Sequence, residues 1–252
     1  MRTKLFGLAA LLAIGSVANA SVVLDQLIAN QADTSQNFVS QTFDPLGSNT
    51  AFNIASIEDF TVGSQFNIDL VEADMGGFGG FTSDAQWSGV TAYRVEIYSS
   101  VLAGASSLTG DVASQTVAPG SVTRTNLGYT NNGVQNGTES LVSIPVNMTV
   151  PSAGTYWIGV IGVLNEQGST SVEMGVLNNN TTSGGKNAEG INPAGGWGFP
   201  GNHQKLSADD GLTFNDIAYR VSGSAPVPEP ASMLALGLGA VALLARRRRK
   251  TA

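Results

Sequence analysis

The chain has 252 residues, a formal net charge of −7, no cysteine, 31 glycines and only 12% charged residues. Such a glycine-rich, weakly charged composition is typical of exported β proteins and argues against a cytosolic helical enzyme. Without cysteine the chain forms no disulfide and carries no thiolate chemistry.

The charge is distributed unevenly along the chain. Seven of the 12 basic residues lie in the two ends, and the segment between keeps five basic against 18 acidic residues, a formal charge near −13. Phosphate binding needs a basic surface, so this segment is not expected to bind nucleic acid. Calcium and neutral sugars remain open as ligands.

Residues 1–20 have the three parts of a secretory signal peptide. Arg2 and Lys4 precede an apolar stretch, residues 5–17, which is short for a permanent membrane span. Ala18 and Ala20 form a small-x-small site that predicts cleavage after Ala20. The alternative is an uncleaved anchor, and in either case we exclude the segment from the fold.

Residues 21–222 are predicted to form one all-β domain, followed by a linker at 223–227. Short alternating runs lie between clusters of Gly, Asn, Ser and Pro, which is the pattern of strands. Expected strands include 90–99, 141–150, 155–164, 171–177 and 212–221, and a hairpin joins 59–62 to 65–70. Gly63 would supply the positive φ of a type II′ turn in that hairpin. This spacing predicts an antiparallel β-sandwich of jelly-roll type, with a single helical turn near Val22–Ala29.

Alternation also predicts which side chains face the core. The expected inward residues are Phe60, Val62, Phe66, Ile68, Leu70, Tyr93, Val95, Ile97, Val142, Ile144, Val146, Met148, Val150, Met174, Val176, Ile217, Tyr219 and Val221, with Arg94, Glu96 and Tyr98 outward. Residues 155–164 are apolar on both faces, which indicates a central strand covered on both sides. Pro145 lacks an N–H and indicates an edge strand.

The last residues, 228–252, combine three features in a fixed order. Pro228, Glu229 and Pro230 are followed by 15 mostly apolar residues at 231–245, then by Arg246, Arg247, Arg248, Arg249 and Lys250. As a helix the apolar stretch is about 22 Å long, short of the ~20 residues of an ordinary span. The basic cluster would hold this end in the cytoplasm with the body outside.

This tail resembles the PEP-CTERM sorting signal of Gram-negative bacteria. The resemblance implies that Pro228, Glu229 and Pro230 are the recognition motif and that an exosortase-type transpeptidase removes the tail. It implies an inner-membrane precursor, a final location at the cell surface or in the medium, and a role in exopolysaccharide or biofilm. The alternative is an ordinary C-terminal anchor. The body, at 58–62, 153–158 and 216–223, is similar to β domains that often precede this tag.

Two glycine-aromatic loops are candidate glycan-binding sites. Their rings are Phe78, with Trp87 nearby, and Trp197 with Phe199. Flat exposed rings can stack on sugars through apolar area and the ring quadrupole. The alternative is that Trp197 and Phe199 close one end of the sandwich.

Calcium is the one cofactor left open by the acidic residues. Asp209, Asp210 and Asp216 place oxygen ligands around one predicted loop, although no complete calcium-loop motif is present. His203 is the single histidine, which argues against zinc and against a Ser-His-Asp triad. The carboxylate pairs Glu58/Asp59, Asp69 with Glu72 and Asp74, and Asp209/Asp210 are the candidates for glycan hydrolysis.

Together these features favour an exported surface or matrix protein that is not an enzyme. The alternatives are a carbohydrate-binding module and a secreted glycan hydrolase.

Overall fold

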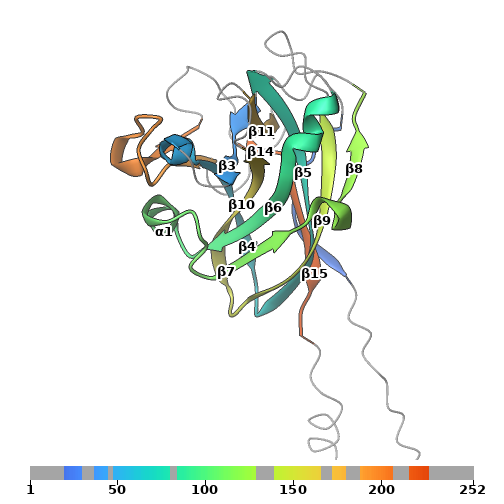
Figure 1. Cartoon of the computed structure of the whole chain (residues 1–252). Coiled ribbons are helices and arrows are strands. Elements are labelled where there is room, and N and C mark those ends of the chain that lie inside the picture. The colour runs from blue at the N-terminus through green and yellow to red at the C-terminus, as the bar shows by residue number, and fades with distance from the viewer. Residues whose placement is uncertain are drawn as a thin grey trace, which may run out of the picture. The chain divides into compact units, whose positions relative to one another are not determined.

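The computed structural model describes residues 20–29, 37–44, 48–79, 84–128, 139–165, 172–179, 188–206 and 216–226. Residues 20–225 form one compact unit, in which two β-sheets pack face to face (Figure 1). All strand pairings but one are antiparallel among the described residues. The predicted antiparallel β-sandwich is therefore confirmed.

The first sheet is built around the long strand β5, Phe66–Gly79. One edge of β5 pairs with β9, and the other pairs first with β15 and then with β11. Its eight described strands are β1 (Ser21–Asp25), β2 (Asn37–Val39), β5, β8 (Thr123–Asn126), β9 (Ser140–Val150), β11 (Val172–Asn179), β14 (Asp216–Ile217) and β15 (Tyr219–Ser224).

The second sheet has β10, Gly154–Asn165, at its centre. β4 and β6 pair with β10 on opposite sides, and β3 pairs with its last residues in the one parallel pairing. Its seven described strands are β3 (Gln41–Asp44), β4 (Ala55–Val62), β6 (Val90–Tyr98), β7 (Ala113–Val117), β10, β12 (Glu189–Ile191) and β13 (His203–Lys205).

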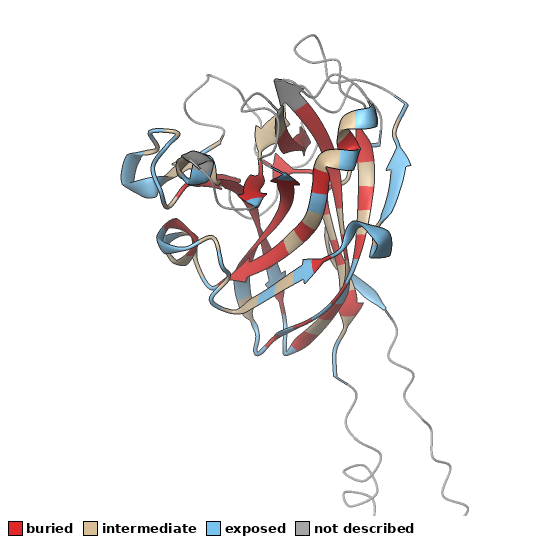
Figure 2. Ribbon diagram, viewed as in Figure 1, coloured by how far each residue is buried: buried red, intermediate tan, exposed pale blue. Residues whose placement is uncertain are grey.

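The main hydrophobic core lies between the two sheets (Figure 2). Its side chains come from alternate positions of the strands, because successive residues of a strand point to opposite faces. The predicted inward residues of 90–99, 141–150, 171–177 and 212–221 are all buried. Burial of this continuous apolar area is the main force that holds the sandwich together.

A second, smaller core covers the outer face of the β10 sheet. Trp157 and Ile161 of β10 pack there with Ala55, Ile57, Tyr98 and Ile191. The cover includes the short helix α1, Val101–Ser106, which begins at an N-cap where Ser100 Oγ accepts from Ala103 N. Thus β10 is buried on both faces, as its apolar pattern predicted.

This second layer corrects one sequence prediction. Glu96 and Tyr98 point away from the main core, as expected, but both are 0% exposed. Glu96 is satisfied there by Arg94 and by the backbone N–H of Gly110. Tyr98 donates its hydroxyl to Leu108 O at 2.9 Å.

The predicted hairpin at Gly63 is wrong. β4 and β5 belong to different sheets, so the chain crosses the sandwich between Val62 and Phe66 instead of turning back within one sheet. Gly63 is not among the residues with positive φ. Beyond it, a bulge between Ile68 and Leu70 shifts the alternation, so that Val71 rather than Leu70 faces the core.

Two other expectations concern single segments. The helical turn near Val22–Ala29 is wrong, because Ser21–Asp25 is strand β1. Pro145 lies on β9 past its last pair with β8, so this half of β9 is an edge. There Gln115 Oε1 accepts from the Asn147 backbone N–H at 2.8 Å.

Residues 1–19 of the predicted signal peptide and the predicted span at 231–245 lie outside the described residues. Within the described part of the chain, no helix is long and apolar enough to cross a membrane.

Candidate functional site

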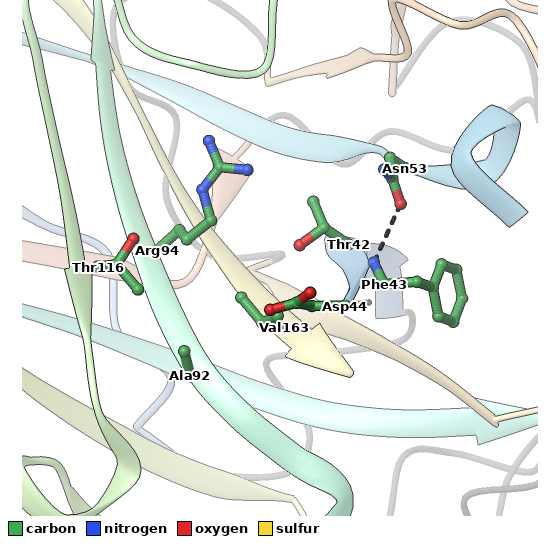
Figure 3. Close-up of a pocket in the computed structure, with 8 residues that line it drawn as sticks. All are labelled: Thr42, Phe43, Asp44, Asn53, Ala92, Arg94, Thr116 and Val163. Atoms are coloured by element: carbon green, nitrogen blue, oxygen red, sulfur yellow. Dashed lines mark hydrogen bonds between the residues drawn. The ribbon is translucent and has the colours of Figure 1, made fainter. Parts of the chain in front are cut away.

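A pocket of about 240 Å³ with a mixed polar and apolar lining opens on the outer face of the β10 sheet (Figure 3). Its floor comes from strands that the sheet brings together. Val163 of β10 lies between Thr42 of β3 and Ala92 of β6, and Arg94 of β6 is opposite Thr116 of β7. Phe43, Asp44 and Asn53 complete the lining.

The hydrogen bonds of the pocket fix the orientation of two of its side chains. Asn53 Oδ1 accepts from the Phe43 backbone N–H at 3.1 Å, so the amide nitrogen of Asn53 is the group left for other partners. Arg94 donates Nε to Glu96 Oε1 at 2.8 Å and Nη2 to Leu108 O at 3.3 Å. Glu96 thus neutralises Arg94.

Asp44 is the remaining charge of the pocket. Its side chain is exposed, and no cation pairs with it among the described residues. The pocket therefore presents one carboxylate, the two hydroxyls of Thr42 and Thr116 and one amide beside the apolar surface of Val163.

The glycine-aromatic loop at 195–201 is fastened to residues 51–53. Asn192 is fully buried and donates Nδ2 to Ala51 O at 3.0 Å and to Asn53 O at 2.7 Å. Its Oδ1 accepts from the Trp197 backbone N–H at 3.1 Å. Asn192 therefore holds both Asn53 of the pocket and the start of the loop.

The two rings of that loop are partly buried. Trp197 stands edge-to-face on Phe52, with centroids 5.6 Å apart, and donates Nε1 to Phe52 O. Phe199 lies so close over Gly190 that a Cβ there would come within 2.6 Å of the ring. Both rings anchor the loop, and Phe52, 41% exposed, is the more open ring.

The other two predicted aromatic residues belong to other segments, Phe78 to β5 and Trp87 to the turn before β6. Trp87 is 7% exposed within the main core, with the Arg124 guanidinium 4.9 Å from its ring centroid. Its ring face is not available to a sugar. The side chain of Phe78 lies outside the described residues.

Two of the carboxylates singled out for hydrolysis, Glu58 and Asp74, are buried inside the domain. Glu58 is fully buried and accepts from the backbone N–H groups of Asp59 and Ile217. Burial raises the pKa of Glu58 well above its usual value, and the neighbouring charge of Asp216 raises it further. Burial likewise raises the pKa of Asp74 to about 6, although the Ile28 backbone N–H opposes the shift.

Glu72 and His203 are each engaged with a neighbouring charged residue. Glu72 is held by Arg220 at 3.1 Å, and the same guanidinium pairs with Asp25. His203 Nδ1 lies 3.4 Å from Glu189 Oε2 on the neighbouring strand.

The predicted calcium ligands are only partly described. Asp216 is buried in β14, 1% exposed, whereas Asp209 and Asp210 lie outside the described residues. Within the described ranges, no group of three or more acidic, histidine or cysteine residues is placed to hold a metal.

Sequence reasoning missed the pocket as a site. The outward position of Arg94 in the strand at 90–99 was predicted, but no strand was predicted at 41–44, where Thr42 and Asp44 lie. No local pattern indicates that β3 lies beside β10 in parallel, which is what brings these residues together. The one available signal was the charged Arg94 between the apolar, inward-facing Tyr93 and Val95.

The comparisons with known proteins concern the end of the chain. No curated protein and no solved structure matches the chain. Residues 226–250 match the family model of the PEP-CTERM protein-sorting motif, and they include Pro228, Glu229 and Pro230. The match implies export and sorting through an exosortase. The chain is thus a β-sandwich protein that carries a C-terminal PEP-CTERM protein-sorting motif.

Proposed function

We propose that the protein is a non-enzymatic component of the cell surface or extracellular matrix, associated with exopolysaccharide. The sorting motif at 226–250 is the observation that carries the proposal. The precursor is exported through a signal peptide at 1–20 and held in the inner membrane by 231–245. It is then released by processing near Pro228-Glu229-Pro230.

The chemistry of the domain supports a role without catalysis. Glycoside hydrolysis needs two carboxyl groups facing each other about 5–10 Å apart across the scissile bond. Glu58 and Asp74 instead accept backbone hydrogen bonds inside the protein, and Glu72 is tied to Arg220. These groups are engaged in contacts within the sandwich.

The test is fractionation of the native host. Wild-type protein is expected in the surface or matrix fraction, and Glu229→Ala is expected to stay in the membrane fraction at higher mass. Asp69→Ala, an exposed acidic residue of β5, is the matched control and should leave sorting unchanged. Wild-type protein confined to the inner membrane would contradict the proposal.

A separate assay addresses catalysis. The secreted protein is incubated with the exopolysaccharide of its host, and reducing ends are measured. No increase over a boiled sample is expected, and steady release of reducing ends would show a hydrolase instead.

A further inference from the structure

We propose that the pocket between β3, β6 and β7 binds one ring of a neutral, polyhydroxylated sugar. The inference rests on the proposed function, because polysaccharide is the partner suggested there. It assigns the contact to Thr42, Asp44, Asn53 and Thr116 rather than to the glycine-aromatic loops.

The size of the pocket limits the ligand. Its volume of about 240 Å³ is below the roughly 300–1,000 Å³ of pockets for drug-sized ligands. A single ring-sized group fits this space. A chain of several rings would have to extend out of the opening.

The hydrogen-bonding groups suit a row of hydroxyls. A carboxylate only accepts, an amide nitrogen only donates, and a threonine hydroxyl does both. Asp44, Asn53 Nδ2 and the hydroxyls of Thr42 and Thr116 together offer all three kinds. A sugar hydroxyl donates and accepts at once, and Val163 offers apolar contact to ring C–H groups.

The charge of the pocket favours a neutral sugar over an acidic one. Arg94 is paired with the buried Glu96, so the carboxylate of Asp44 gives the pocket a negative charge. A carboxylate or sulfate on the ligand would be repelled by Asp44 and would find no free cation to compensate it in the described lining.

The pocket is held in shape before any ligand arrives. Thr42 lies on β3, which is paired with β10, and Thr116 lies on β7, which is paired with β6. The side chain of Asn53 is hydrogen-bonded to the Phe43 backbone N–H, and its backbone carbonyl is hydrogen-bonded to Asn192. Binding therefore orders few groups, which lowers its entropic cost. Phe52, the residue before Asn53, exposes a ring that a neighbouring sugar unit can stack on.

The experiment is amide chemical-shift mapping on ¹⁵N-labelled protein purified from its host. Glucose, galactose, mannose and N-acetylglucosamine are titrated to about 50 mM, since a single ring is expected to bind with a Kd in the millimolar range. At least one of them should shift the amides of residues 42–44, 53, 94 and 116. Glucuronate should shift them several-fold less.

Two variants and one control test the assignment. Asp44→Asn should weaken binding about tenfold, since it removes a charge-assisted hydrogen bond. Thr116→Leu should abolish binding by filling the opening, at an exposed strand position that tolerates the change. Asp69→Asn, the same change at an exposed position of the other sheet, should bind like wild type.

The outcomes separate this proposal from the proposed function. The pocket assignment fails if no neutral sugar shifts these amides, if Asp44→Asn binds unchanged, or if only calcium chloride shifts them. In those cases the wild-type protein could still be found in the matrix fraction, and the proposed function would be unaffected. If a sugar binds but the protein stays in the membrane fraction, the proposed function fails and the pocket assignment stands.

Discussion

Asp74 is a buried carboxylate whose ionisation opposes folding. Its pKa is about 6 in the folded protein, against 3.8 for the free side chain, because burial removes the carboxylate from water. Between these two values the folded state keeps a proton that the unfolded state has lost. The free energy of unfolding therefore falls as pH rises through this window.

Asp74→Asn should remove that pH dependence. The amide oxygen of Asn can still accept from the Ile28 backbone N–H, which Asp74 Oδ2 binds at 2.8 Å. Between about pH 5 and 8 the wild-type protein should lose about 1–2 kcal/mol more stability than the variant. Urea denaturation at the two pH values measures the difference. Asp69→Asn should behave like wild type, and an unchanged slope in Asp74→Asn would contradict the assignment.

Asn192 is the residue that ties the glycine-rich loop to the pocket. Asn192→Ala removes three hydrogen bonds and leaves their backbone partners without a replacement. We expect a loss of about 2–4 kcal/mol in the free energy of unfolding, together with a shift in Trp197 fluorescence.

Asn147→Ala is the control for that experiment. Asn147 is exposed on β9, and its backbone rather than its side chain carries the hydrogen bond to Gln115. Its stability should stay within about 0.5 kcal/mol of wild type. Equal effects of the two substitutions would show that the Asn192 contacts contribute little.

At the scale of elements, the crossing from β4 to β5 shows what alternation predicts and what it omits. Phe60 and Ile68 were correctly assigned to the core, because period-two polarity reports the face of a strand. The same pattern carries no information about the partner strand, so two neighbouring strands of opposite sheets were taken for a hairpin. Leu70 was assigned wrongly because the bulge inserts one residue into the alternation.

The buried position of Glu96 could not be predicted for a related reason. A charged residue between apolar ones indicates an outward side chain, and Glu96 does point outward. Whether another layer covers that face depends on how the nearby α1 folds back and on Ile191 of β12, which is distant in sequence. Of the candidate site, only the outward position of Arg94 was readable. The sorting motif is local, and its recognition from the sequence is confirmed by the family model at 226–250.

Two glycines, Gly63 between β4 and β5 and Gly223 of β15, allow a matched test of how closely the strands pack. A Cβ at Gly223 of β15 would clash with the Asn67 backbone carbonyl of β5, whereas a Cβ at Gly63 meets nothing within 4 Å. Gly223→Ala should cost about 2 kcal/mol or more, since the backbone must move. Gly63→Ala should be neutral or stabilising by up to about 1 kcal/mol. Thermal melts compare the two, and a reversed order would contradict the register of β15.

At the scale of the whole domain, the first and last strands lie side by side. Ser21 of β1 is paired with Gly223 of β15, and β15 also pairs with β5. β1 begins directly after the predicted cleavage site at Ala20. The described chain continues only two residues beyond β15, to Pro226.

Because β15 lies between β1 and β5, the domain should need it to fold. A chain of residues 21–225 should unfold in one cooperative transition followed by circular dichroism. A chain of residues 21–218 loses Tyr219 and Val221, both 0% exposed, and two strand pairings. It should show no cooperative transition, and a cooperative melt of the shorter chain would contradict the role given to β15.

The central claim is that the working protein is the sandwich without its two ends. Intact-mass spectrometry of the protein purified from its native host tests this most directly. The account predicts a chain that begins at Ser21 and ends upstream of the basic cluster at 246–250, together with any group attached at the new C-terminus. A mass that still contains Arg246–Lys250 in the surface or secreted fraction would contradict it.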